Sequence, residues 1–404
     1  MLLSIFFLST FAVLIFFAKP AFGEVDNFNL QVIVTVPKTT PEKDRVFISG
    51  NHRLLGNWKS AGALMTKIAP YTYEFNAYLP KAKSIEFKFT RGDFKKIEKS
   101  FEGFDIPNRF ISLETGGQSI VKCRLECEVE AWKDMLPKDA AVHSYKLNLI
   151  GDYKLYKNVE SKYLQLKRDV IVWMPEGYSS KENREKRYPV LYMHDGNNLF
   201  DARLSFQGVD WGVDEAIDRL VKTKKMKEII VVGIYNTEAR LDEYAPMRDE
   251  KRGGGGLGED YSRFVVEELK PFIDEKFRTL TDPSNTAVGG SSLGGLISLY
   301  MGLEYPEVFG GMLVISPALY WDNYSIIPWA MSKGFDNSRN RLWMDMGLLE
   351  GRTALRSSRI LDGEIRKNYP QFKSYKYREF KDAQHNEAAW RARIHLALAF
   401  MFGA

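Results

Sequence analysis

The sequence predicts two folded domains: a small all-β sandwich, then a larger α/β domain built on a mainly parallel sheet. A chain of 404 residues is longer than one ordinary domain. Before about residue 141 apolar and polar residues alternate with period two, as in half-buried strands. After it, short apolar runs alternate with amphipathic helical stretches, which is typical of a sheet with helices on both faces.

The N-terminus carries an apolar run, "LLSIFFLSTFAVLIFFA" at 2–18, followed by small residues up to Gly23. This pattern predicts a signal peptide over residues 1–23, so that the remainder is secreted or periplasmic. The run is slightly shorter than a bilayer span, and an uncleaved membrane anchor is therefore the alternative.

The first domain is expected over residues 24–130. Its predicted strands are separated by Gly, Pro, Asn and Asp clusters, and they read "LQVIVTV", "RVFISG", "YTYEFNAYL", "SIEFKFTR" and "SIVKCRLECEV". Cys123 and Cys127 lie four residues apart on the last of these, about 13 Å along a strand. That separation excludes a bridge and predicts two free thiols. A linker is expected over residues 131–141.

The second domain is expected over residues 142–404. "HSYKLNLIG" and "RDVIVWMPEGY" should be its leading, antiparallel strands. The following strands and helices alternate, in the order "YPVLYMHDG", "GVDEAIDRLVK", "EIIVVGIY", "EDYSRFVVEELKPFIDEKF", "NTAVGGSS", "LGGLISLYMGLEYP", "GGMLVISP", "RLWMDMG", "KYREFKD" and "NEAAWRARIHLALAFMF".

The composition limits the classes of partner and cofactor that the protein is expected to bind. With 27% charged residues, a formal net charge of +5 and no basic block, the chain is unlike a nucleic-acid-binding protein. The sequence shows no metal-ligand or nucleotide-loop motif, so neither a metal nor an organic cofactor is expected.

The motif "VGGSSLGGL" at 288–296 singles out one serine. Ser292 has Gly290 two residues before it and Gly294 two after it, the G-x-S-x-G spacing of a nucleophile held on a sharp turn between strand and helix. Because this spacing is common by chance, a Gly-rich phosphate loop or an incidental turn is the alternative.

A serine nucleophile needs a base and an acid, which follow it along the chain in α/β hydrolases. Of the histidines after Ser292, His395 lies within the predicted last helix, whereas His385 lies in the loop before it and is the predicted base. Glu350, just after the strand "RLWMDMG", is the predicted acid. Its competitors are Asp345, within that strand, and Asp362, on a predicted helix surface.

An anion site is expected beside the serine. One donor is the amide of Leu293, and the other is the amide of Asn197, in the loop "MHDGNN" that follows a predicted strand. Arg240 and Tyr244 belong either to a loop bordering the active site or to an ordinary surface loop.

Six motifs in order, "RDVIVWMPEGY", "YPVLYMHDGNNLFD", "WGVDEAIDRL", "IIVVGIYNTEARLDEYAP", "GGSSLGGL" and "QHNEAAW", resemble the putative-esterase family of α/β hydrolases. That family includes enterochelin-esterase-like proteins and the feruloyl and acetyl xylan esterases of carbohydrate esterase family 1. The resemblance implies a triad of Ser292, Glu350 and His385, with the amides of Leu293 and Asn197 as oxyanion hole. It does not transfer a substrate, since the family also includes acyltransferases.

The motifs "ISGNHRLLGNWKSAGAL", "YLPKAKSIEFKFTR" and "DIPNR" resemble the starch-binding modules of carbohydrate-binding family 20. This resemblance implies sugar contacts from Trp58, Lys88 and Asn108, with Phe101 where the family usually has a second tryptophan. Since Ile85, Phe87 and Phe89 share one strand face, Lys88 should lie on the opposite, outward face. Alternatively, Trp58 is a structural aromatic in a module that only packs against the hydrolase.

These observations predict an exported serine esterase that hydrolyses a carboxylic ester on or near a carbohydrate, with polysaccharide as a possible partner. The alternatives are a siderophore esterase of the enterochelin type, an acyltransferase, and a non-catalytic glycan-binding protein.

Overall fold

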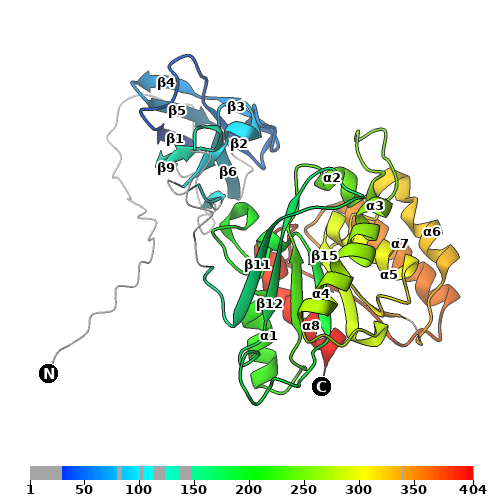
Figure 1. The fold of residues 1–404 in the computed structure, drawn as a ribbon. Coiled ribbons are helices and arrows are strands. Elements are labelled where there is room, and N and C mark those ends of the chain that lie inside the picture. Colours follow the sequence, from blue (N-terminus) through cyan, green and yellow to red (C-terminus); the bar gives the residue numbers. More distant parts are fainter. Residues whose placement is uncertain are drawn as a thin grey trace.

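The computed structural model describes residues 30–79, 84–100, 103–106, 108–112, 123–136, 147–338 and 340–403. The predicted signal peptide at 1–23 and the candidate sugar contact Phe101 lie outside these residues. Figure 1 shows a small β domain, in blue, above a larger α/β domain that runs from green to red.

The first domain is the predicted all-β sandwich, made of two four-stranded sheets. Alternate side chains of its strands, such as Val32 and Val34, point into the shared core and are fully buried. One sheet has the order β4 (Thr66–Ala69), β5 (Thr72–Ala77), β1 (Leu30–Thr35) and β9 (Cys123–Glu128). The other has the order β3 (Ala63–Leu64), β2 (Phe47–Gly50), β6 (Ser84–Thr90) and β8 (Arg109–Ser112).

The sandwich continues beyond residue 130, so the predicted linker at 131–141 starts too early. Strand β10 (Ala131–Trp132) pairs with β7 (Glu98–Lys99). The Trp132 indole is buried in the sandwich core and donates a 2.8 Å hydrogen bond to Thr40. Burial of this large side chain extends the domain to the short helical turn η3 (Lys133–Met135).

Cys123 and Cys127 are free and half-buried on β9, as their spacing predicts. Burial raises the pKa of the Cys127 thiol to about 11, so this thiol is protonated and unreactive at neutral pH.

The second domain is built on an eight-stranded mixed sheet with β11, β12 and β14 antiparallel and the remaining neighbours parallel. The order is β11 (Asp152–Val159), β12 (Arg168–Met174), β14 (Ile230–Ile234), β13 (Val190–His194), β15 (Thr286–Ser291), β16 (Gly311–Ile315), β17 (Arg341–Gly347) and β18 (Tyr375–Phe380). The predicted α/β-hydrolase architecture is therefore confirmed.

The leading strand lies later than predicted. Residues 147–151 of "HSYKLNLIG" form no strand, because their amides bond to side chains: Asn148 donates to Asp201 and Ile150 to Asp214, at 2.9 and 2.7 Å. Gly151, with φ of 91°, then turns the chain into β11.

Helices cover both faces of the sheet. The helices α1 (Val213–Lys222) and α8 (Glu387–Phe402) pack on one face. The other face is covered by α3 (Gly258–Arg263), α4 (Lys270–Lys276), α5 (Leu293–Glu304), α6 (Ile326–Lys333) and α7 (Arg352–Asn368). In the part of the chain that the structure describes, none of the helices combines the length and apolar character needed to cross a bilayer.

A buried ion pair fixes the short helix α2 (Arg240–Glu243) to the sheet. The Arg168 guanidinium on β12 donates to both carboxylate oxygens of Glu243, at 3.0 and 2.8 Å, and the two side chains are 0% and 2% exposed. Such a pair tolerates the loss of one partner poorly, because the other charge is left buried.

Substitution Glu243→Gln should therefore lower the free energy of unfolding of the hydrolase domain by about 3–5 kcal/mol. Urea unfolding of the full chain measures the change. Glu250→Gln is the matched control, since Glu250 and its partner Arg248 are 80% and 58% exposed and the pair contributes about 1 kcal/mol or less. Equal effects of the two substitutions would contradict the assignment.

Candidate active site

Ser292 occupies a sharp turn between β15 and α5. Its φ of 59° and ψ of −120° place a non-glycine residue in a strained backbone region. Its N–H donates to the Ile315 carbonyl at 3.1 Å, and its own carbonyl accepts from the Ala318 amide at 2.9 Å. These bonds hold the turn against the segment that follows β16.

The flanking glycines make the turn sterically possible. A Cβ on Gly290 would lie 3.0 Å from the Gly294 carbonyl carbon, so the strand and the helix approach each other through these two residues. A Cβ on Gly294 would lie 3.4 Å from the His194 Cβ and 3.5 Å from an Asp195 oxygen. The first turn of α5 therefore packs directly against the loop after β13.

Glu350 and His385 form a hydrogen-bonded pair at the same edge of the sheet. His385 Nδ1 lies 2.8 Å from Glu350 Oε2, and the Glu350 side chain is fully buried while that of His385 is 37% exposed. The Trp390 ring contacts the imidazole edge to face, with centroids 5.1 Å apart. With Nδ1 directed at the carboxylate, Nε2 is the nitrogen left for a serine.

The other Glu350 oxygen is saturated by donors. Oε1 accepts from the Gly347 amide at 2.7 Å, the Ser316 hydroxyl at 2.7 Å and the Arg393 guanidinium at 3.1 Å. Sequence reasoning missed Ser316 and Arg393, because they come from other elements and carry no local motif. Together they fix the orientation of the carboxylate.

The competing acids are engaged elsewhere. Asp345 is buried and accepts from Arg393 at 3.1 Å and from the Trp343 indole at 2.8 Å, and burial raises its pKa. Asp362 on α7 binds Arg366 and Tyr375, each at 2.8 Å.

Ser292 is linked to this pair through the segment 315–318. Ser316, which lies between the two residues that hold the Ser292 backbone, bonds both Glu350 and the Trp390 indole. Within the described residues the Ser292 hydroxyl has no hydrogen-bond partner.

Two backbone amides are the candidate oxyanion donors. Leu293 begins α5 and Asn197 lies in the helical turn η5 (Gly196–Asn198), and first-turn N–H groups lack an acceptor within their own helix. The dipole at the start of α5 also favours negative charge there.

A cluster of hydrogen-bonded side chains around Asp195 holds the loop that carries Asn197. Asp195, at φ of 56°, receives two bonds from Arg240, at 2.6 and 2.8 Å, and one from Asn236 at 2.7 Å. The Asp195 amide donates to the hydroxyl of Tyr244, which is fully buried. Burial alone would raise the pKa of Asp195, but Arg240 outweighs it and the pKa is lowered. Arg240 and Tyr244 thus hold in place the loop that carries Asp195 and Asn197.

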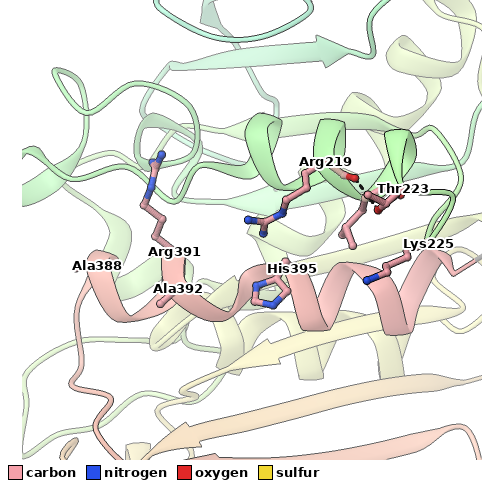
Figure 2. Close-up of a pocket in the computed structure, with 8 residues that line it drawn as sticks. Arg219, Thr223, Lys225, Ala388, Arg391, Ala392 and His395 are labelled. Carbon is pink, nitrogen blue, oxygen red and sulfur yellow. Dashed lines mark hydrogen bonds between the residues drawn. The ribbon is translucent and has the colours of Figure 1, made fainter. Parts of the chain in front are cut away.

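The remaining histidines near the sheet are unsuited as bases. His194 is buried against the Tyr261 hydroxyl, and burial lowers its pKa to about 3. His395 lines a cavity of about 610 Å³ between α1 and α8, together with Arg219, Lys225 and Arg391 (Figure 2). Arg391 and His395 of α8 line this cavity, whereas Trp390 and Arg393 of the same helix bond Ser316.

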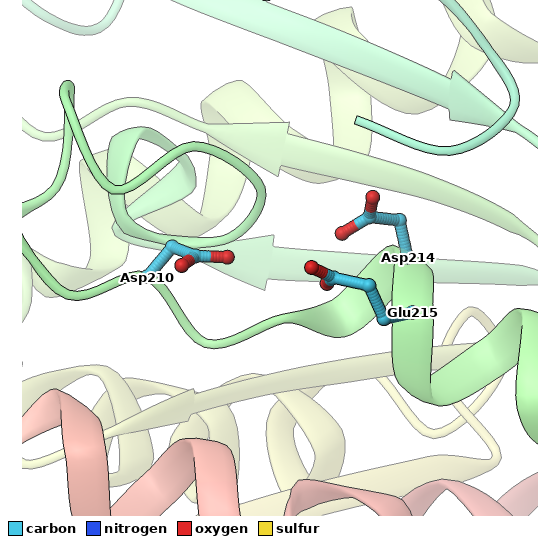
Figure 3. Close-up of side chains that lie close together, drawn as sticks. All are labelled: Asp210, Asp214 and Glu215. Carbon is cyan, nitrogen blue, oxygen red and sulfur yellow. The ribbon is translucent and has the colours of Figure 1, made fainter. Parts of the chain in front are cut away.

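Three acidic side chains lie close together at the start of α1. Among the described residues Asp210, Asp214 and Glu215 bring ligand atoms within 4.8 Å of one another (Figure 3). Arg391 already binds Asp210 at 2.6 Å and Glu215 at 3.0 Å. Burial and the neighbouring Glu215 raise the pKa of Asp214. The cluster therefore ties α1 to α8 through Arg391.

The candidate sugar contacts lie on and beside the sheet β3-β2-β6-β8. Trp58 is half-buried, and its amide donates to the Gly50 carbonyl at 2.8 Å. Asn108 donates to Glu86 at 3.1 Å. Lys88 is on the predicted outer face of β6, but it is 3% exposed rather than open to solvent, since Phe206 of the hydrolase domain lies over it.

Comparison with known proteins assigns the family. The model of the putative esterase family matches residues 161–401, more than half of the chain. The chain belongs to the putative esterase family. The starch binding domain model matches residues 29–122, so both predicted resemblances are confirmed.

Several relatives share the esterase domain. The chain is 28% identical over 190 residues to the uncharacterized protein YbbA of Bacillus subtilis, covering 46% of this chain and 70% of that protein. It is 31% identical over 197 residues to the endo-1,4-beta-xylanase/feruloyl esterase of Xylanibacter ruminicola, covering 48% of this chain but 26% of that relative.

A crystal structure resembles both domains together. The enterobactin esterase FES of Shigella flexneri, solved in the presence of 2,3-di-hydroxy-N-benzoyl-serine, superposes with a TM-score of 0.54 at 18% identity and 92% coverage of each chain. This likeness shows a common fold. With the family assignment, the esterase relatives make the protein a carboxylic ester hydrolase.

The contacts of Glu350 predict that substitution of Arg393 lowers the esterase activity. In Arg393→Gln we expect kcat/KM to fall about a hundredfold at neutral pH, because the carboxylate loses an orienting donor. The measurement is kcat/KM for p-nitrophenyl acetate at neutral pH, compared with the wild type.

Asp345→Asn should also lower kcat/KM, because it weakens the contact that holds the Arg393 guanidinium in place. Arg391→Gln, on the same helix but bonded to Asp210, is the control and should keep the wild-type kcat/KM. Equal losses in Arg393→Gln and Arg391→Gln would contradict the role given to Arg393.

Proposed function

We propose that the protein is a serine esterase with Ser292 as nucleophile, His385 as base and Glu350 as the orienting acid. The observation that carries this proposal is the 2.8 Å contact between His385 and Glu350, formed beside a serine on a strained turn. Arg393 and Ser316 bond Glu350 and hold it in place. Nε2 of His385 is left to accept the proton of the Ser292 hydroxyl.

In the proposed reaction the Ser292 oxygen attacks the ester carbonyl while His385 takes its proton. The amides of Leu293 and Asn197 stabilise the negative oxygen of the tetrahedral intermediate. His385 then returns the proton to the departing alcohol. Water attacks the acyl-enzyme by the same route, releasing the acid and restoring the serine.

An ester on or near a carbohydrate is the proposed substrate. The starch-binding domain of the chain and the xylanase/feruloyl esterase relative support this choice. A siderophore ester is the second candidate, because the two-domain arrangement resembles that of an enterobactin esterase over 92% of the chain. The apolar run at 2–18 supports export to the periplasm or the medium.

Substitution Ser292→Ala should lower kcat for p-nitrophenyl acetate by about 10⁶-fold, as expected for removal of a nucleophile. Ser291→Ala provides a matched control, since Ser291 is the buried last residue of β15. It should retain activity. Turnover by the Ser292 variant at the wild-type rate would reject the mechanism.

A screen of acetylated and feruloylated oligosaccharides against catecholate trilactones tests the substrate. We expect the highest kcat/KM on a carbohydrate-linked ester. The highest value on a catecholate trilactone would replace this proposal with the siderophore alternative.

A further inference from the structure

Lys88 brings an ammonium group of the sandwich to the hydrolase domain. It projects from the outer face of β6 and is 3% exposed, and its Nζ lies 6.0 Å from the centre of the Phe206 ring. Within the described part of the chain this ammonium makes no hydrogen bond and no ion pair. Asp105 and Glu98 lie within electrostatic range of Lys88, but they form their ion pairs with Lys99 and Arg109. A nearly buried ammonium that makes no direct contact is costly, so it marks a position where a ligand oxygen would be stabilising.

Phe206 connects this position to the proposed oxyanion loop. Its ring, in the turn η6 (Phe206–Gly208), is 56% exposed, which is unusual for a large aromatic side chain. Its amide donates to Asn198 Oδ1 at 2.9 Å, and the same oxygen accepts from the Asn197 side chain at 2.7 Å. One side-chain oxygen thus fixes both the aromatic ring and Asn197, a proposed oxyanion donor.

Glu387 provides a second link between Lys88 and the site. It begins α8 two residues after His385 and is buried. Burial and Asp195 raise its pKa to about 7, and the positive charges of Arg240 and Lys88 oppose that rise. Lys88 therefore lies within electrostatic range of Glu387, two residues from the proposed base.

We propose that Lys88 and Phe206 form a substrate subsite shared by the two domains. A hydroxylated ring of the ester packs on Phe206 and accepts a hydrogen bond from Lys88 while its carbonyl lies at Ser292. This inference rests on the proposed function. It assigns Lys88 to ester selection, because the hydrolase covers the part of β6 that a free polysaccharide would have to reach.

The shared chemistry, a ring bearing hydroxyl groups, fits a sugar or a phenolic acyl group. The test therefore uses three soluble esters: acetylated maltotriose with sugar rings, methyl ferulate with a phenolic ring, and ethyl acetate with no ring. The measured quantity is the ratio of kcat/KM for each ring ester to kcat/KM for ethyl acetate.

In Lys88→Met and in Phe206→Ala this ratio should fall about tenfold to hundredfold for at least one ring ester. Loss for the maltotriose ester identifies a sugar subsite, and loss for methyl ferulate identifies a phenolic one. Lys67→Met, an exposed lysine on the opposite sheet of the sandwich, is the control and should keep the wild-type ratio.

Wild-type ratios in both variants would overturn the proposal. They would do so even if Lys88→Met bound starch more weakly than the wild type, because that loss would concern polysaccharide binding and not ester selection. Equal losses on the ring esters and ethyl acetate would also overturn it. Ser292→Ala tests the proposed mechanism separately. Wild-type activity in that variant would reject Ser292 as nucleophile, whereas the kcat/KM ratios of the Lys88 and Phe206 variants would still report on the subsite.

Discussion

The geometry of the site depends on a carboxylate that is removed completely from water. Both oxygens of Glu350 have hydrogen-bond partners there: Oε2 faces His385, and Oε1 receives bonds from Gly347, Ser316 and Arg393. A carboxylate buried without such partners would destabilise the fold. The orientation of His385 therefore depends on groups from two strand ends and the last helix.

A similar constraint acts on the other side of Ser292. The loop after β13 adopts a left-handed conformation at Asp195, and the paired Arg240 side chain stabilises it. Gly294 lets the first turn of α5 approach that loop closely. The two candidate oxyanion amides are thereby brought together by elements that lie nearly a hundred residues apart in the chain.

The residues of the candidate triad could be proposed from the sequence because each has a local context. Ser292 has flanking glycines, His385 stands between the last strand and the last helix, and Glu350 follows a strand. Ser316, Arg393 and Asp195 could not be found in this way, since long-range packing alone gives them their partners. The outer face of Lys88 followed from strand alternation, but its burial depends on a neighbouring domain, which periodicity does not report.

The position of α8 has a consequence for biosynthesis. As the polypeptide leaves the ribosome, the serine turn emerges well before His385 and the helix that carries Arg393. If Ser292 and His385 act as proposed, a nascent chain that ends before His385 has the nucleophile without its base. Ester cleavage would then start only after translation has passed this helix.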